Sequence, residues 1–395
     1  MFKEFTMSQP KDKIPAHIKP KQFQHPAKTN RVILVLQDVE DPRKPSCNFR
    51  HSLVAIIFIS LMGVLCGAKD WEEIIQAAHG IIDWLNQYVD LTAGIPSSKT
   101  LKRVMGMIPT KSLEKLLQNI QFVIGDIIAI DGKTLRGSRG WDKSDRPLHL
   151  LHAWSTELGV CLGQVSVDEK SNEIIAFHDL IESLELKGTI VTTDALNTQK
   201  KIAAAIVSKG ADYVLPVKEN HKDLYNDIEL LFQGADKKEF KGIDGAEVQT
   251  LEKSAGRLEE RYYELIDICD LPAAKEWSGS SSIGRVTRKR TKGDKTSIEV
   301  CLYITTLDLD IEKFAKSVRK HWGVENGLHL ALDVIFDEDK HRNQDRIGAA
   351  NLSLLRKVAL GILSKDSSLK CGRPAKQMRA ATSSTYGDHL IKNCF

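Results

Sequence analysis

Two short apolar runs in this chain each end on an aspartate. One run is Ile127-Ile128-Ala129-Ile130-Asp131, and the other is Thr189-Ile190-Val191-Thr192-Thr193-Asp194. A strand that ends on a carboxylate delivers it to the edge of a sheet, where ligands of open α/β sheets bind. A third carboxylate, Glu325, follows in a later helical pattern. Together they predict an all-oxygen pocket suited to a pair of Mg²⁺ ions.

Each of these three carboxylates also has an ordinary structural interpretation. Asp131 could be the first turn residue after a strand, and Asp194, followed by Ala-Leu-Asn, could cap a helix. Glu325 could lie on a solvated helix face. The order of strand, strand and late helix favours the functional interpretation over these alternatives.

Composition and charge exclude some classes of protein. With 395 residues the chain should fold into two or three units, and its net charge of +4 is only a weak sign of a polyanionic partner. Seven scattered cysteines without a Cys-x-x-Cys pair predict neither a zinc site nor a disulfide framework, so we expect a reducing cytosol. The apolar stretch at residues 53–68 is shorter than a bilayer span, so we expect a buried helix and no membrane partner.

The first part of the chain is predicted to be helical. Residues 1–30, rich in lysine and proline, are expected to form a disordered basic leader. Residues 31–121 are expected to form an all-helical accessory domain that binds DNA or assists the catalytic domain. Its helical patterns lie at residues 53–68, 71–89, 97–107 and 110–120.

The pattern changes to α/β at residue 122. Strands and helices alternate as in an RNase H-like mixed sheet, and we assign residues 122–365 to that domain. A β-rich insertion at about residues 235–306 interrupts it, and residues 366–395 are expected to be a basic C-terminal tail. The core strands are expected at 122–131, 149–156, 160–167, 189–193 and 213–217, with helices at 173–184 and 198–209. The insertion strands are expected at 246–251, 261–268, 281–288 and 297–305, and the last helices at 311–319, 322–335 and 347–363.

The residues after Asp131 exclude two other phosphate chemistries. Gly132-Lys133-Thr134 lacks the earlier glycine of a P-loop, because Ile127 stands there. Lys133 stands where an Asp-x-Asp phosphatase needs its second aspartate. Lys133 and Arg136 are therefore interpreted as cations that contact a phosphate beside the carboxylates.

The pattern around Glu325 places further polar side chains on one helix face. Trp322, Glu325, Asn326, His329 and Asp333 recur at steps of three or four residues. An internal hydrogen-bonded pair of His329 and Asp333 is the alternative, and Trp322 could simply pack. The densest basic run, residues 285–292, could likewise be a solvated hairpin. The candidate DNA contacts are Lys133, Arg136, Lys218, Arg257, Arg288, Lys289, Arg290, Arg319, Trp322, Asn326 and His329.

Three motifs resemble the DDE transposases of the H-repeat-associated insertion-sequence family. They are the run from Asp131 to Ser138, the Thr-Asp-Ala at Asp194, and the run from His321 to His329 with the Leu-Asp-Val-Ile-Phe-Asp-Glu-Asp that follows it. Residues 41–43, 65–68, 71–74 and 94–97 resemble the family's accessory helical domain, so the similarity covers about residues 35–390. Where the family usually has His-Gly-Arg-Ile-Glu, this chain has alanine before Gly256 and Arg257, and Leu330 replaces a common tryptophan.

The resemblance implies a specific activity. It implies an RNase H-like core in which Asp131, Asp194 and Glu325 bind two Mg²⁺ or Mn²⁺ ions, cleavage at element ends and joining of the 3′-hydroxyl to target DNA. The implied partner is double-stranded DNA, bound by a dimer or higher assembly in the bacterial cytosol or nucleoid. Two alternatives remain: a catalytically degenerate DNA-binding descendant, and a metal-dependent nuclease without strand transfer.

Overall fold

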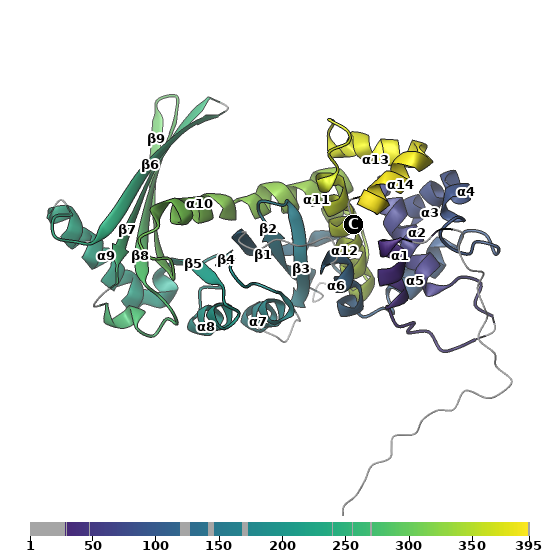
Figure 1. The fold of residues 1–395 in the computed structure, drawn as a ribbon, viewed down its shortest axis with the longest axis horizontal. Coiled ribbons are helices and arrows are strands. Elements are labelled where there is room, and N and C mark those ends of the chain that lie inside the picture. The colour runs from purple at the N-terminus through teal and green to yellow at the C-terminus, as the bar shows by residue number, and fades with distance from the viewer. Residues whose placement is uncertain are drawn as a thin grey trace, which may run out of the picture.

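The computed structural model describes residues 28, 30–46, 48–118, 127–140, 146–167, 173–238, 240–254, 256–268 and 271–393. The molecule is elongated, with a bundle of helices at one end and a sheet that runs to the other (Figure 1). Nearly all of the predicted basic leader and the first residues of the strand predicted at 122–131 lie outside the described residues.

The N-terminal region is helical, as predicted. Polar side chains start its helices: Ser52, Asp70 and Ser97 each accept a hydrogen bond from a backbone N–H in the first turn. The helix predicted at 53–68 is almost completely buried and packs against the late helix α12 (Arg346–Lys365). The helices are α1 (Arg31–Gln37), α2 (Leu53–Leu65), α3 (Trp71–Gly80), α4 (Ile82–Leu85), α5 (Ser98–Met105) and α6 (Thr110–Gln118).

The core sheet has the strand order expected of an RNase H-like fold. In the order β3-β2-β1-β4-β5, the first three strands are antiparallel and β1, β4 and β5 are parallel. Helices α7 (Glu173–Ser183) and α8 (Lys200–Ser208) lie side by side below the sheet in Figure 1. The predicted fold class is therefore confirmed. The strands are β1 (Ile127–Leu135), β2 (Leu148–Ser155), β3 (Val160–Val167), β4 (Ile190–Thr192) and β5 (Asp212–Val217).

The β-rich insertion extends this sheet. Strand β9 pairs antiparallel with β5, so the four insertion strands bring the sheet to nine strands. The sequence analysis assigned no helix between β5 and the insertion, where the structure has α9 (Lys222–Lys237). The insertion strands are β6 (Gly245–Ser254), β7 (Arg257–Asp267), β8 (Ser282–Lys292) and β9 (Lys295–Thr305).

The last helices cross back over the sheet to the helical end. Helix α10 (Ile311–His321) leads into a π-helical segment, η4 (Val324–His329), and then into α11 (Leu330–Phe336). Within the described residues, α12 is the one helix long and apolar enough to span a membrane, but 89% of its apolar window is buried inside the protein. It is the central core helix.

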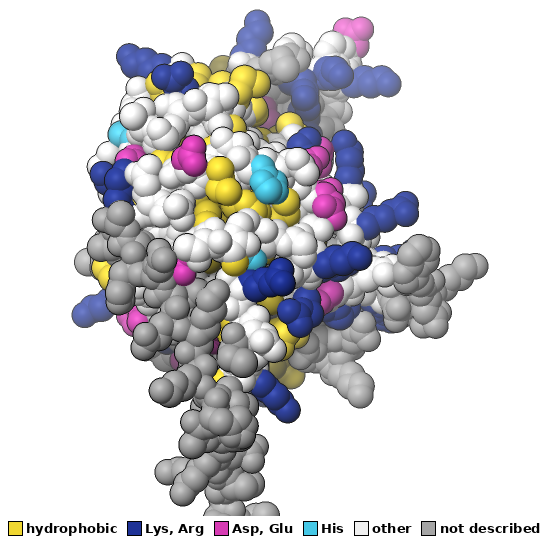
Figure 2. Space-filling view, turned by 90° about the vertical axis from the view of Figure 1, so that its right-hand side faces the viewer, with side chains coloured by type: hydrophobic (Ala, Val, Ile, Leu, Met, Phe, Trp, Pro, Cys, Tyr) yellow, Lys and Arg dark blue, Asp and Glu magenta, His cyan; other side chains and the backbone are white. Residues whose placement is uncertain are grey.

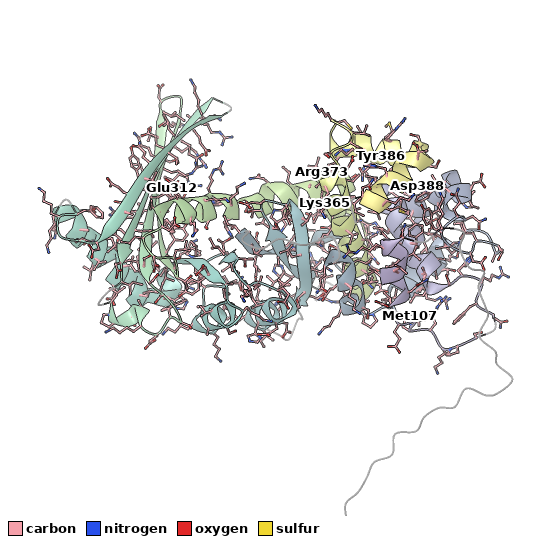
Figure 3. The ribbon with its side chains drawn as sticks, viewed as in Figure 1. Met107, Glu312, Lys365, Arg373, Tyr386 and Asp388 are labelled. Atoms are coloured by element: carbon pink, nitrogen blue, oxygen red, sulfur yellow. The ribbon has the colours of Figure 1, made fainter. Side chains whose placement is uncertain are left out.

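No helix was predicted in the basic C-terminal tail. Residues 366–395 contain two helices, α13 (Arg373–Thr382) and α14 (Ser384–Asn393), that pack at the helical end of the molecule. Asp388, which Figure 3 labels at the helical end, accepts hydrogen bonds from Trp84 Nε1 at 2.7 Å and from Tyr88 Oη at 2.6 Å. These contacts hold the C-terminal segment on the N-terminal helices. In Figure 2, which views this end, Lys and Arg side chains stand around an apolar centre.

Candidate active site

The sheet register brings Asp131 and Asp194 to the same level. Strands β1 and β4 are parallel neighbours, and Ala129 is paired with Thr192. Asp131 and Asp194 each follow two residues after that pair. Two carboxylates that are distant in the sequence therefore lie at the same level of neighbouring strands. The predicted end of the first strand at Asp131 is wrong, because β1 continues to Leu135 along the antiparallel β2, whereas Asp194 does follow the end of β4.

Glu325 reaches the site on a helix that crosses this sheet. His321, in the last turn of α10, lies 3.1 Å from Thr192 Oγ1, two residues before Asp194. Burial lowers the pKa of His321 to about 4, and the negative charge of Asp194 opposes this shift. The segment η4 then buries Val324 while Glu325 stays exposed. A π-helical segment is uncommon and is frequently found at functional sites.

The pKa of Asp131 records the proximity of the other carboxylates. Burial, together with the negative charges of Asp194, Glu325 and Glu173, raises this pKa to about 6, and the N–H of Gly132, 2.8 Å from Oδ1, opposes the shift. Like charges that lie close together disfavour ionisation in this way. Asp194 and Glu325 therefore both lie within electrostatic reach of Asp131.

The sequence analysis missed the residues that orient Asp194. Asn197 Nδ2 donates to Asp194 Oδ1 at 2.9 Å and to Glu173 Oε1 at 3.0 Å. Asp194 Oδ1 also accepts the backbone N–H of Asn197, as a helix cap would, but α8 begins only at Lys200. Glu173 begins α7 and lies 3.8 Å from His149 Nε2. An asparagine three residues after Asp194 was the available signal for this contact.

The alternative interpretation, an internal pair of His329 and Asp333, is not what the structure shows. His329 Nδ1 lies 3.8 Å from Asp131 Oδ2, and burial lowers the pKa of His329 to about 4, so the imidazole is neutral. Asp333 instead accepts a hydrogen bond from Lys133. His152, opposite Asp131 in β2, is fully buried with its ring 5.7 Å from that of His329.

The structure contradicts the prediction that Lys133 contacts DNA. Its side chain is only 7% exposed, and Nζ lies within 4 Å of carboxylate oxygens of Asp333, Glu338 and Asp339. A buried ammonium held by three carboxylates does not reach a DNA phosphate. Arg136, with a side chain 83% exposed, does face solvent. Of the two cations predicted beside the carboxylates, Lys133 is therefore buried and Arg136 is exposed.

The cations of the insertion are paired with acidic side chains on neighbouring elements. Arg288 binds Glu299 and lies 5.6 Å from the Trp322 ring, and Lys289 pairs with Glu260 at 3.2 Å. Arg319 of α10 donates to Glu252. Arg290 lies 3.7 Å from Glu259, while Arg257 and Asn326 are exposed. Lys218 lines a groove of about 640 Å³ that Asp194 also lines.

The donor set suits a hard divalent cation. In the described ranges, no group of three His, Cys, Asp or Glu side chains converges closely enough to ligate one ion alone. Mg²⁺ does not need three protein ligands, because it is usually held by one or two carboxylates together with water and substrate phosphates. Asp131, Asp194 and Glu325 all offer carboxylate oxygens. Oxygen donors without thiolates favour Mg²⁺ or Mn²⁺.

The fold and this acidic site define a class of protein, the RNase H-like nucleic-acid enzymes with a DDE carboxylate set. Residues 124–362 match the family described as the transposase DDE domain, and residues 33–120 match the DDE_Tnp_1-associated family. The chain belongs to the DDE transposase family. Enzymes of this family generally use divalent metal ions.

Named relatives resemble the chain over most of its length. "Putative transposase YncI" of Escherichia coli O157:H7 is 34% identical over 374 residues, 92% of this chain and 94% of that protein. "H repeat-associated putative transposase YhhI" of Escherichia coli (strain K12) is 36% identical over 349 residues, 85% of this chain and 91% of that protein. The predicted family resemblance is therefore confirmed. Among solved structures, the cryo-EM piggyBac transposase synaptic complex with hairpin DNA aligns over 92% of this chain and 79% of that chain, with a TM-score of 0.46 and 10% identity.

Proposed function

We propose that this chain cuts the ends of an insertion sequence and joins the 3′-hydroxyl to target DNA by metal-dependent phosphoryl transfer. Asp131, Asp194 and Glu325 are the proposed catalytic and metal-binding residues. The observation that carries the proposal is the sheet register that brings Asp131 and Asp194 to the same level of neighbouring strands, with Glu325 close enough for its charge to act on Asp131. A carboxylate surrounded by like charge gains most from a bound cation.

The neighbouring residues prepare this site for the reaction. Two bound Mg²⁺ or Mn²⁺ ions would supply an activated water or hydroxyl and charge stabilisation at the attacking and leaving oxygens. Asn197 holds the Asp194 carboxylate in one orientation, and the Gly132 N–H does the same for Asp131. His321 holds the Glu325 helix over β4. Such outer contacts keep metal ligands oriented before substrate arrives.

We propose that double-stranded DNA contacts the exposed polar residues around the carboxylates. Arg136, Lys218, Arg257, Trp322 and Asn326 have accessible side chains or line the groove beside Asp194. The paired cations Arg288, Lys289, Arg290 and Arg319 would join the interface by exchanging a carboxylate partner for a phosphate. The buried Lys133 and His329 are left out of this interface.

A catalytically degenerate, DNA-binding descendant is the second candidate. It is favoured by one relative, named "Inactive transposase YbfQ", which is 36% identical over 55 residues, 14% of this chain. A protein that only binds DNA does not need three acidic side chains near its phosphate-binding surface, because their negative charges repel the DNA phosphates. The first candidate accounts better for the carboxylates.

Organisation and location follow from the proposed reaction. We propose that residues 31–121 form an accessory domain, that residues 122–365 form the catalytic domain, and that the protein acts on DNA in the bacterial cytosol or nucleoid. Joining two element ends to one target requires both ends at one assembly. We therefore propose a dimer or higher assembly on DNA.

The test is incubation of the purified protein with Mg²⁺ or Mn²⁺ and DNA that carries the repeats flanking its own locus. We expect cuts at the repeat ends and joined products, both lost with EDTA. Asp131→Asn and Asp194→Asn should abolish cleavage and leave DNA binding largely intact. The matched control is Asp294→Asn, at an exposed turn between β8 and β9. Cleavage by both site variants at the wild-type rate would reject the assigned site, and binding without cleavage by the wild type would favour the degenerate descendant.

A further inference from the structure

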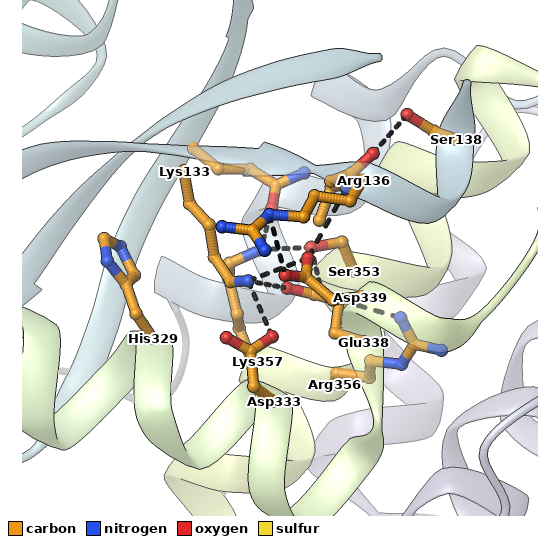
Figure 4. Close-up of polar contacts among 12 residues, drawn as sticks. Lys133, Arg136, Ser138, His329, Asp333, Glu338, Asp339, Ser353, Arg356 and Lys357 are labelled. Atoms are coloured by element: carbon orange, nitrogen blue, oxygen red, sulfur yellow. Dashed lines mark hydrogen bonds and ion pairs between the residues drawn. The ribbon is translucent and has the colours of Figure 1, made fainter.

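Lys133 joins the strand that carries Asp131 to the helix that carries Glu325. It follows Asp131 by two residues in β1, so both side chains leave the same face of the sheet. Its Nζ lies 2.7 Å from Asp333 Oδ1, 3.3 Å from Asp339 Oδ1 and 3.8 Å from Glu338 Oε2 (Figure 4). The ammonium is therefore fixed on three sides.

Asp333 lies on the same helical rod as Glu325. The backbone angles are helical at Gly323, His329 and Leu330, so η4 continues into α11 without a break. Asp333 follows Glu325 by eight residues, about two turns. A rotation or shift of the rod at Asp333 would therefore move Glu325 as well.

The third partner, Glu338, is anchored to the protein core. Its side chain is fully buried, and Oε1 accepts a hydrogen bond from Ser353 Oγ at 2.8 Å and lies 3.5 Å from Arg356 Nη1. Lys357 joins Ser353 to Gln164 of β3. Ser353, Arg356 and Lys357 all belong to the core helix α12, as Figure 4 shows. Lys133 is thus tied to a part of the molecule that does not move easily.

We propose that Lys133 is a positioning residue that fixes the separation of Asp131 and Glu325 through its ion pair with Asp333. This inference rests on the proposed function, because it assigns the pair a role in metal binding. The negative charges of Asp194 and Glu325 act against that of Asp131, so the helical rod that carries Glu325 would otherwise move away from Asp131. The ion pair opposes that movement without contacting metal or DNA.

The test compares two variants that each remove one carboxylate from Lys133. Asp333→Asn removes the contact between Lys133 and the Glu325 rod, whereas Asp339 belongs to the short 3-10 helix η5 (Glu338–Lys340), which follows the end of that rod. We expect Asp333→Asn to weaken Mn²⁺ binding about tenfold, as loss of an outer-shell contact does. The turnover number at saturating DNA should fall while KM for DNA stays unchanged. Asp339→Asn should bind Mn²⁺ like the wild type, and Asp333→Glu should recover part of the loss.

Mn²⁺ binding is measured directly, by electron paramagnetic resonance or calorimetry, on folded protein below its unfolding midpoint. Equal losses in both asparagine variants, or unchanged Mn²⁺ binding in Asp333→Asn, would overturn the positioning role. So would a wild type that does not bind Mn²⁺. A wild type that binds Mn²⁺ without cutting DNA would reject the proposed function, and the comparison of the two variants would still decide the role of Lys133.

Discussion

Two regions of this molecule are dense in ion pairs, but the pairs differ in burial. In the insertion sheet, the side chains of Lys289 and Arg290 are each 40% exposed beside their glutamates. In the cluster around Lys133, the Lys133 side chain is 7% exposed and that of Glu338 is fully buried. The first set is in contact with water, and the second is part of the core.

This difference in burial suggests different uses. An exposed pair contributes about 0–1 kcal/mol and exchanges its partner easily. A buried pair adds little stability compared with apolar residues in the same place. Removal or displacement of one partner, however, leaves an uncompensated buried charge, so the pair keeps its two side chains in a fixed arrangement. Under the proposed function, the insertion would release its cations to DNA phosphates, whereas the cluster around Lys133 would hold the carboxylates in place.

The largest expected effect is that of Lys133→Met. It leaves Asp333, Glu338 and Asp339 facing one another without their cation, and we expect a loss of about 3–5 kcal/mol in the free energy of unfolding. Denaturant unfolding measures this loss. Lys289→Met is the control, since it removes a half-exposed cation, and it should cost less than about 1 kcal/mol. Similar losses for the two variants would contradict the contrast between the two regions.

A smaller effect of opposite sign is expected for Asp131→Asn without metal. The folded-state pKa of Asp131 is raised from its ordinary 3.8 to about 6, so the ionised carboxylate destabilises the folded protein above pH 6, and this cost disappears as the pH falls toward 4. Two pH units correspond to about 3 kcal/mol at most, and we expect a gain on the order of 1–2 kcal/mol at pH 8.

Thermal unfolding of Asp131→Asn in EDTA, at pH 8 and at pH 4, measures this gain. Asp294→Asn, at an exposed turn, is the control and should change little at either pH. Added Mn²⁺ should stabilise the wild type more than Asp131→Asn, because the variant lacks the shared ligand. If Asp131→Asn is no more stable than the wild type at pH 8, the ionised Asp131 carboxylate does not destabilise the folded protein.

Much of the fold was predictable because its signals are local. Alternating strands and helices predicted the RNase H-like order, and the strand at Val160–Val167 was predicted with its observed bounds. The proximity of Asp131 and Asp194 was predictable because each follows a short apolar run in neighbouring parallel strands, although β1 continues past Asp131 to Leu135 whereas β4 ends at Thr192. Their level is set by the pairing of Ala129 with Thr192, which the sequence does not state.

The remaining features depend on contacts between distant segments. Lys133 next to an exposed Arg136 looks like a second phosphate contact, and only its burial among residues of α11, η5 and α12 shows otherwise. The α13–α14 helices are polar and show little hydrophobic patterning, and they are held by contacts such as that of Asp388 with Trp84. The π-helical segment at Glu325 also has no sequence signature, because helical spacing predicted a regular helix there.

The smallest effect on stability is expected when Arg288, Lys289 and Arg290 are changed together to glutamine. Lys289 and Arg290 are each 40% exposed, and Arg288, which is 22% exposed, pairs with the exposed Glu299, so the unfolding midpoint should change only modestly. DNA binding should weaken, and the slope of log K against log salt should flatten by about two to three, since each lost phosphate contact accounts for about 0.9. Arg285→Gln is the matched control: this arginine, 17% exposed, is held by Asp236 and Glu264, and its loss should lower stability and leave the slope unchanged. An unchanged slope in the triple variant would remove β8 from the DNA interface, and with it the idea that the insertion exchanges its carboxylates for phosphates.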